Sequence, residues 1–179
     1  MRWEDRLDGL FEDLEQQAEG LALVERDVEV AELSRAEYAA LDLTARLHGS
    51  VGCRVQVAVS GVGRLEGVLR RVGDGWCLLD ADGDEWIVRG CALGSLRGLT
   101  DRAVAAGARS AAARLGLASA LRLLVDGRGA AVLHRLDGTL SRGRLARVGA
   151  DFVEVADEDA RTGVVETVPF AALAAVRSA

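Results

Sequence analysis

The feature that most constrains the fold is a sequence motif that occurs twice, 76 residues apart. Residues 67–79 read GVLRRVGDGWCLL, and residues 143–155 read GRLARVGADFVEV. Both copies contain G-x-L-x-x-V-G, then two small or acidic residues, then an aromatic residue, Trp76 or Phe152, that opens a second apolar run. Similarity at a fixed spacing is typical of one supersecondary unit that is used twice. We therefore expect two copies of one structural unit.

Alternating apolar and polar residues predict a similar series of short strands in each copy. In the first copy the pattern predicts strands at about 55–59, 65–72, 76–80 and 85–89 and a closing segment at 91–97. In the second copy it predicts strands at about 131–136, 140–148, 152–156 and 164–168, an acidic loop at 157–163, and a closing segment at 170–176. Asp82-Gly83 and Asp137-Gly138 are hairpin-turn sequences.

Three helices are predicted outside these strands. An apolar position recurs in steps of four and three along residues 3–31, which is typical of a coiled-coil seam. Its members are Trp3, Leu7, Leu10, Leu14, Gln17, Leu21, Val24, Val28 and Ala31, with Gln17 as a polar break. The capping-box pattern Ser34-x-x-Glu37 predicts a second helix to about Leu47, ended by His48-Gly49. The Ala- and Arg-rich stretch 100–125 predicts a third, with Gly107 and Gly116 as candidate breaks.

Charge is distributed unevenly along the chain, whose net charge is −6. Residues 1–50 contain 13 acidic residues and 5 arginines, a net charge of −8. Residues 101–150 contain 9 arginines and 3 acidic residues, a net charge of +6. Charge separation of this size can steer a partner or hold one segment of a chain against another.

A helix followed by five short, bent strands, with G-x-L in the second strand, resembles the Sm-like family and other small SH3-type barrels. The likeness is strongest at Ile87-Val88-Arg89-Gly90, which resembles the I-R-G sequence before the last Sm strand, whereas the second copy departs there with Val168-Pro169-Phe170. The resemblance covers about residues 41–97 and 117–177. It implies a small barrel for each copy, in which Gly67 and Gly143 let the second strand bend sharply.

The residues that read RNA bases in Sm proteins are missing from both copies. Sm proteins use a loop of the form D-x-x-apolar-N. Gly73 and Gly149 stand at the Asp position, and Cys77 and Val153 stand at the Asn position. The resemblance therefore implies the fold and not the RNA site. The whole chain also resembles an uncharacterised group of actinobacterial proteins, which brings no established activity.

These observations predict an α+β fold with two small Sm-like five-stranded β-barrels, each preceded by a helix, and an N-terminal acidic helical arm. The expected parts are the arm at 1–38, the first helix and barrel at 39–98, and the arginine-rich helix and second barrel at 99–179. Pairing of the two barrels through edge strands would cover edges that small barrels otherwise leave open.

The first functional hypothesis is a non-enzymatic scaffold or regulatory protein that binds a protein partner or associates with itself through the N-terminal helix. Aromatic residues are favoured at interfaces. The expected contact residues are Trp3, Leu7, Leu10, Phe11 and Leu14. The alternative is that the same apolar stripe packs on the chain's own barrels. The sequence has no apolar run of membrane-spanning length and an acidic start unlike a signal peptide, so we expect a cytoplasmic protein.

The second hypothesis is binding of RNA or DNA by the arginine-rich region 102–147. Arginine binds phosphate well through its planar, forked guanidinium group. The candidate residues are Arg102, Arg109, Arg114, Arg122, Arg128, Arg142, Arg144 and Arg147. The acidic whole chain and the scarcity of aromatic residues for base stacking count against this hypothesis.

Enzymatic activity is the third hypothesis and has the least support. His48 and His134 have no neighbouring nucleophile pattern, and the carboxylate pairs lie in predicted turns, where acids are usually solvated. Three cysteines without a C-x-x-C pair predict ordinary buried thiols and not a metal site. We therefore expect no catalytic residues, no metal, no cofactor and no small-molecule substrate.

Overall fold

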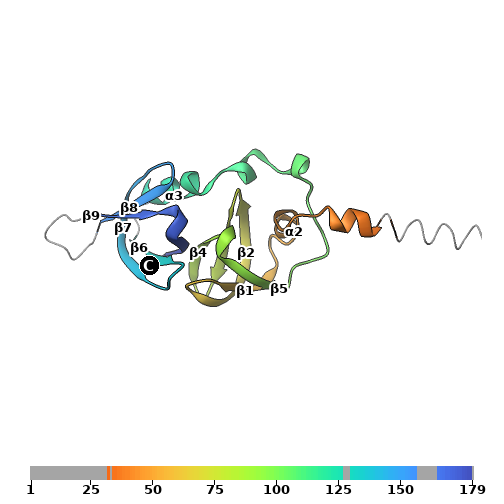
Figure 1. Ribbon diagram of the computed structural model, residues 1–179, viewed down its shortest axis with the longest axis horizontal. Coiled ribbons are helices and arrows are strands. Elements are labelled where there is room, and N and C mark those ends of the chain that lie inside the picture. Colours follow the sequence, from red (N-terminus) through yellow and green to blue (C-terminus); the bar gives the residue numbers. More distant parts are fainter. Residues whose placement is uncertain (1–31, 33, 127–129, 157–164, 179) are drawn as a thin grey trace, which may run out of the picture. The chain divides into compact units, whose positions relative to one another are not determined.

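The computed structural model describes residues 32, 34–126, 130–156 and 165–178. The chain divides into two compact units, Met1–Leu41 and Asp42–Ala179. In the first unit, residues 34–39 are helical. All of the described β-strands belong to the second unit (Figure 1).

The described part of the second unit contains ten strands in one antiparallel sheet. The strands are β1 (Arg54–Val59), β2 (Gly63–Gly73), β3 (Trp76–Ala81), β4 (Asp84–Arg89), β5 (Leu93–Arg97), β6 (Ala130–Arg135), β7 (Leu140–Val148), β8 (Phe152–Ala156), β9 (Val165–Pro169) and β10 (Leu173–Ser178). Their order in the sheet is β5-β1-β2-β3-β4-β10-β6-β7-β8-β9. We call residues 43–97 the first half and residues 117–178 the second half; the strands of the two halves follow the same pairing order.

The predicted pair of closed barrels is wrong. Among the described strands, β5 pairs with β1 only and β9 pairs with β8 only, so the sheet has two open ends. The edge of β4 that a closed first barrel would use is occupied by β10, with Val176 opposite Ile87 and Arg177 opposite Trp86. The two halves therefore join into a single open sheet, and the structure is mostly antiparallel β-sheet, not an α+β pair of barrels.

Most strand positions predicted from the alternation are confirmed within one or two residues. The first strand, for example, is expected at 55–59 and spans 54–59. The turn between β3 and β4 also has the geometry that Asp-Gly favours, because both Asp82 and Gly83 have positive φ angles, of 56° and 88°. Bulges in β2 between Leu69 and Arg71, and in β7 between Leu145 and Arg147, increase the local twist of both long strands.

The predicted helix from residue 34 to 47 is interrupted. Residues 40–42 separate the helical residues 34–39 from α2 (Leu43–Gly49), which ends at the predicted glycine. Asp42 causes the new start, because its side chain accepts a hydrogen bond from the Ala45 backbone N–H at 2.5 Å and caps α2.

The predicted helix over 100–125 is wrong for most of its length. Only α3 (Leu117–Asp126) is α-helical, and the residues before it contain two short 3₁₀ turns, η2 (Ala106–Ala108) and η3 (Ala111–Arg114). Contacts with the first half keep this segment from forming an α-helix. The Val104 N–H donates to the Ala45 carbonyl at 3.0 Å, and the Asp74 N–H donates to the Leu115 carbonyl at 3.1 Å. These tertiary contacts outweigh the helix propensity of the alanines.

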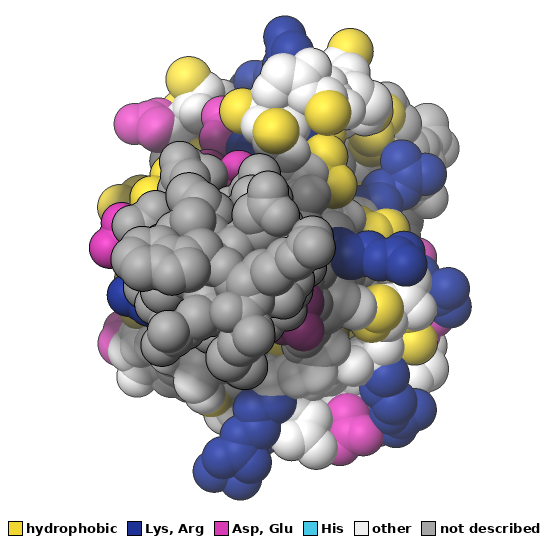
Figure 2. Space-filling view, turned by 90° about the vertical axis from the view of Figure 1, so that its right-hand side faces the viewer, with side chains coloured by type: hydrophobic (Ala, Val, Ile, Leu, Met, Phe, Trp, Pro, Cys, Tyr) yellow, Lys and Arg dark blue, Asp and Glu magenta, His cyan; other side chains and the backbone are white. Residues whose placement is uncertain are grey.

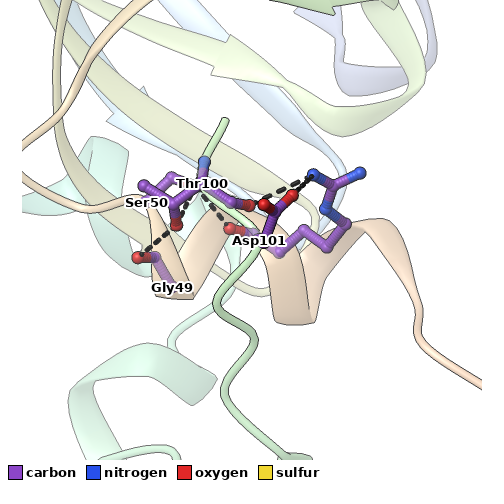
Figure 3. Close-up of polar contacts among 5 residues, drawn as sticks. Gly49, Ser50, Thr100 and Asp101 are labelled. Atoms are coloured by element: carbon purple, nitrogen blue, oxygen red, sulfur yellow. Dashed lines mark hydrogen bonds and ion pairs between the residues drawn. The ribbon is translucent and has the colours of Figure 1, made fainter. Parts of the chain in front are cut away.

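A polar cluster fastens the start of this segment to the end of α2 (Figure 3). The buried Ser50 hydroxyl accepts a hydrogen bond from the Thr100 N–H at 3.0 Å and donates to the Arg46 carbonyl at 2.9 Å. The Thr100 hydroxyl donates to the Gly49 carbonyl at 3.1 Å, and the Arg46 guanidinium lies 3.8 Å from the Asp101 carboxylate. From this anchor the segment runs along one side of the sheet to α3 (Figure 1).

The two halves share their hydrophobic cores. The core around Leu69 and Leu79 of the first half includes Ala174 and Ala175 from β10. The core around Leu121 of α3 includes Trp76 and Ile87 from the first half. Arg89 adds a polar link, because its guanidinium donates to the carbonyl oxygens of Phe170 and Leu173. The halves are therefore interlocked by strand pairing and by packing.

Candidate interaction surface

An apolar groove lies between α3 and strands β3 and β4. It consists of two adjoining cavities with volumes of about 450 and 200 Å³. Both are lined by the same residues at their junction: Leu78, Glu85, Ile87, Leu123 and Leu124. We call this surface the α3 groove.

The α3 groove exposes large apolar side chains to solvent. Leu123 is 67% exposed and Leu124 is 39% exposed, and at the larger cavity Leu115 and Val51 are 42% and 45% exposed. The buried residues of α3 are Leu117, Ala120 and Leu121, which pack on the second core, and Ala120 also lines the larger cavity. Because an α-helix has 3.6 residues per turn, Leu123 cannot share the buried side with Leu121.

One wall of the groove is held in place by Trp76. The Trp76 indole is almost fully buried, and its N–H donates to the Leu115 carbonyl at 2.8 Å. The backbone N–H of Asp74 donates to the same carbonyl. The segment just before α3 is thus fixed to the turn between β2 and β3, and the exposed Leu115 side chain stays at the groove.

Charged side chains rim the α3 groove, and most of them are basic. Arg70 and Arg71 line the larger cavity, Arg177 lines the smaller one, and Glu85 lines both. Arg70 pairs with Asp80 at 2.7 Å and Arg177 pairs with Asp84 at 2.8 Å. Arg71 is exposed and forms no ion pair within the described part of the chain.

His48 also lines the larger cavity, next to a salt bridge. Burial, and then the positive charge of Arg109, lower the pKa of His48. Arg109 pairs with Asp42 at 3.1 Å. The pKa of Asp42 is lowered mainly by the hydrogen bond from the Ala45 N–H and also by Arg109. The hydrogen bond that caps α2 is thus one of the causes that lower the pKa of Asp42.

The expected contact residues of the N-terminal helix, Trp3, Leu7, Leu10, Phe11 and Leu14, lie outside the described residues, as does Arg128. The other arginines of the nucleic-acid hypothesis fall into separate groups. Arg102, Arg109 and Arg114 lie in the segment between β5 and α3, Arg122 lies on α3, and Arg142, Arg144 and Arg147 lie on β7.

The structure does not bring these arginines onto one surface. Arg142 and Arg144 alternate with buried residues of β7, including Leu145, so they face away from α3, which packs on the Leu145 side. Arg147 pairs with Glu154 at 2.5 Å, and Arg122 donates to the Gly149 carbonyl at 3.0 Å. On the described part of the face in Figure 2, arginine side chains likewise lie at several separate places, some beside acidic side chains.

Within the described ranges, no group of three or more His, Cys, Asp or Glu residues could hold a metal ion. The described part of the chain also contains no helix that is long and apolar enough to cross a membrane. Burial raises the pKa of Cys77 to about 12, so this thiol is a core group and not a nucleophile.

Sequence reasoning missed the α3 groove, although one signal for it was present. Leu117, Leu121 and Leu124 fit one side of the expected helix, but Leu123 falls outside that stripe. Adjacent leucines in a helix point in different directions, so one of them must face a second apolar surface or solvent.

A scan against protein-family models found no match, and a search of curated proteins found no similar sequence.

Proposed function

We propose that this protein is a non-enzymatic scaffold or regulatory protein that binds a protein partner in the α3 groove and associates with itself through its N-terminal segment. The observation that carries the proposal is the pair of exposed leucines, Leu123 and Leu124, which line an open groove together with Leu78 and Ile87. Contiguous exposed apolar surface with a polar rim is typical of interaction sites.

The shape and chemistry of the groove favour an apolar protein segment as the ligand. Apolar grooves commonly bind the apolar face of an amphipathic helix. Covering one exposed leucine side chain completely contributes about 1.5–3 kcal/mol. Two leucines and their apolar neighbours therefore provide enough energy for a reversible contact.

The groove can be tested with the fluorescent dye anilinonaphthalene sulfonate, which binds exposed apolar surface, on a truncation that lacks residues 1–33. Asp42–Ala179 is a compact unit with its own cores, so the truncation should fold. We expect Leu123→Glu to reduce dye binding severalfold. Leu140→Glu is the matched control, because Leu140 is 48% exposed and lies outside the groove. Equal dye binding by both variants, with unchanged thermal unfolding, would contradict the proposal.

Self-association can be tested by light scattering on the full chain and the truncation. We expect the mass of the full chain to rise with concentration at low and high salt, while the truncation stays monomeric. A truncation that associates as strongly as the full chain would place the contact outside residues 1–33.

Nucleic-acid binding is a second candidate, favoured by one observation. Arg142 and Arg144 are exposed on one face of β7 and form no ion pair with another described residue. We expect the variant with both arginines changed to Glu to lose binding of labelled RNA or duplex DNA at low salt. Arg147→Glu is the control, since Arg147 is already paired with Glu154. No binding by the wild type at low salt would exclude this candidate.

A further inference from the structure

We propose that the two open ends of the sheet bind each other between copies of this chain, with β9 of one copy paired to β5 of the next. Among the described strands, β5 has one edge without a strand partner, and so has β9. Such an edge presents a row of N–H and C=O groups that can pair with another chain. The contact involves neither the α3 groove nor residues 1–33.

The first argument is that β5 and β10 occupy equivalent places in the two halves. Leu96 of β5 lies opposite Val57 of β1, and Val176 of β10 lies opposite Leu133 of β6. Both pairings also contain a bulge. The second edge of β10 pairs with β4, so β10 shows what kind of strand the free edge of β5 can bind.

The second argument is that β9 is equivalent to β4. Val88 of β4 lies opposite Cys77 of β3, and Val168 of β9 lies opposite Val153 of β8. The other edge of β4 pairs with β10, whereas the corresponding edge of β9 pairs with no described strand. The join inside the chain is therefore a contact between β4 and β10, and the two ends of the sheet offer the equivalent strands, β9 and β5.

The join inside the chain also predicts the register between copies. The opposed residues of β10 and β4 are Ala175 and Val88, Val176 and Ile87, and Arg177 and Trp86. Their counterparts in β5 and β9, in the same order, are Ser95 and Val168, Leu96 and Thr167, and Arg97 and Glu166. These three pairs are the contact that we expect between copies.

Arg97 and Glu166 have opposite charges in this register. Arg97 is exposed and forms no ion pair with another described residue. Glu166 is exposed too; it pairs with Arg135, and its second carboxylate oxygen can accept from another arginine. Opposite charges that face each other across antiparallel strands contribute about 0.2–1 kcal/mol. The counterpart of Arg97 at the join inside the chain, Arg177, likewise pairs with an acid, Asp84, at 2.8 Å.

Pro169, at the end of β9, does not prevent this pairing. Proline has no backbone N–H to donate to a neighbouring strand. Its counterpart in β4 is Arg89, which lies outside the three pairs that join β4 to β10. The pairing between copies therefore requires only Glu166, Thr167 and Val168 of β9.

The contact is small, and each copy can make it at both ends. Stable interfaces bury about 1,200–2,000 Å², and three residue pairs fall short of that area. We therefore expect the contact near millimolar concentration, so the truncation that lacks residues 1–33 should remain monomeric at micromolar concentration. Because the two copies use different surfaces, the contact is heterologous and can repeat beyond a dimer.

Disulfide trapping in the full chain tests the contact. Opposite residues of antiparallel strands have Cα atoms about 4.5–5.5 Å apart, a separation that a disulfide bridges. One variant carries Arg97→Cys and the other carries Glu166→Cys, and in both the exposed Cys91 is changed to Ser. At millimolar concentration, we expect the mixture to form a disulfide-linked dimer severalfold faster than either variant alone.

A matched mixture controls for random collision. In it, Arg142→Cys replaces Glu166→Cys, because Arg142 is exposed on β7, a strand inside the sheet. This mixture should form the linked dimer no faster than the single variants.

Charge reversal tests the register. At millimolar concentration, Arg97→Glu and Glu166→Arg should each lower the mass of the full chain seen by light scattering, because like charges would then face each other. An equimolar mixture of the two variants restores opposite charges at each contact, so the mass should recover. Thermal unfolding of each variant verifies that it is folded.

Three outcomes would overturn the inference. The first is a mixture that cross-links no faster than the Arg142→Cys control. The second is equally fast cross-linking within a single variant, because β5 would then pair with β5, or β9 with β9. The third is a mass that neither charge reversal changes.

Discussion

Two glycines are required by the aromatic ring that follows each of them. A Cβ atom on Gly73 would overlap the Trp76 ring, and a Cβ atom on Gly149 would overlap the Phe152 ring. The rings lie over glycines at matching places in the two halves. This contact explains why both copies of the motif have glycine three residues before the aromatic residue.

We therefore expect Gly73→Ala and Gly149→Ala each to destabilise the protein by about 1–3 kcal/mol, because the ring must move from its packed position. The measurement is the free energy of unfolding in urea. Gly107→Ala is the control, since nothing lies within 4 Å of a Cβ atom there. A free energy of unfolding equal to that of the Gly107→Ala control would contradict this prediction, because the ring would then move without any loss of stability.

His134 gives a second prediction at this scale, for the dependence of stability on pH. Its ring lies 5.0 Å from the Trp86 ring, and its Nε2 atom is buried without a hydrogen-bond partner among the described residues. Burial, and then the charges of Arg177 and Arg142, lower the pKa of His134 below the ordinary value of 6.5. Below about pH 6.5 the unfolded chain therefore takes up a proton that the folded chain does not.

Stability should consequently fall as the pH drops from 6.5 through the folded pKa of His134, and the effect should vanish above pH 6.5. We expect His134→Gln to lose less stability than the wild type between about pH 7.5 and pH 5.5, measured by thermal unfolding. His48, whose pKa is also lowered, titrates in both proteins and so does not account for a difference. If the stability of the wild type and of the His134→Gln variant changes with pH in the same way, His134 is not the cause of the pH dependence.

At the element scale, the strands could be predicted from the sequence and the segment before α3 could not. Alternation along β1 reports which side of that strand is buried, and this property belongs to the strand itself. The path of residues 100–116 depends instead on partners far away in the sequence, such as Trp76 for Leu115. The groove was missed for the same reason, because its two walls come from Leu123 and Ile87, in different halves.

Trp76→Phe tests whether that distant contact holds the segment. The variant keeps an aromatic ring over Gly73 but removes the hydrogen bond to the Leu115 carbonyl. The Leu115 carbonyl keeps the hydrogen bond from the Asp74 N–H, so the loss is that of one hydrogen bond, about 0.5–1.5 kcal/mol. We expect faster proteolysis between residues 101 and 116 and a lower free energy of unfolding. The control is Trp86→Phe, because the Trp86 ring packs in the first core and against His134. An unchanged rate of cleavage between residues 101 and 116 would show that other contacts hold this segment in place without the Trp76 hydrogen bond.

At the scale of the whole molecule, closure of the sheet was the feature that sequence could not decide. Each half has the strands that a small barrel needs, and the pattern of apolar residues is the same whether the last strand returns to its own half or not. The outcome depends on which strand pairs with the edge of β4, and β10 takes that place with Val176 opposite Ile87. Pairing between the halves covers the edge strand β4 of the first half and the edge strand β10 of the second half. In two closed barrels, each of these edges would instead be covered by a strand of its own half.

Because the halves share their cores, we expect them to unfold together. Leu133 is fully buried in the second half, so Leu133→Ala should destabilise the protein by about 2–5 kcal/mol. If unfolding is cooperative, hydrogen exchange should accelerate by the same factor in residues 54–73 of the first half and in residues 130–148 of the second. Leu123→Ala, at an exposed position, is the control and should leave both rates unchanged.

Acceleration confined to residues 130–148 would mean that the second half opens alone. The structure argues against this, because opening the second half would remove β10 from β4 and expose Trp76 and Ile87, which pack in the second core. It would also break the hydrogen bond from Arg89 to the Leu173 carbonyl. A first half left with these buried groups in water would lose much of its own stability.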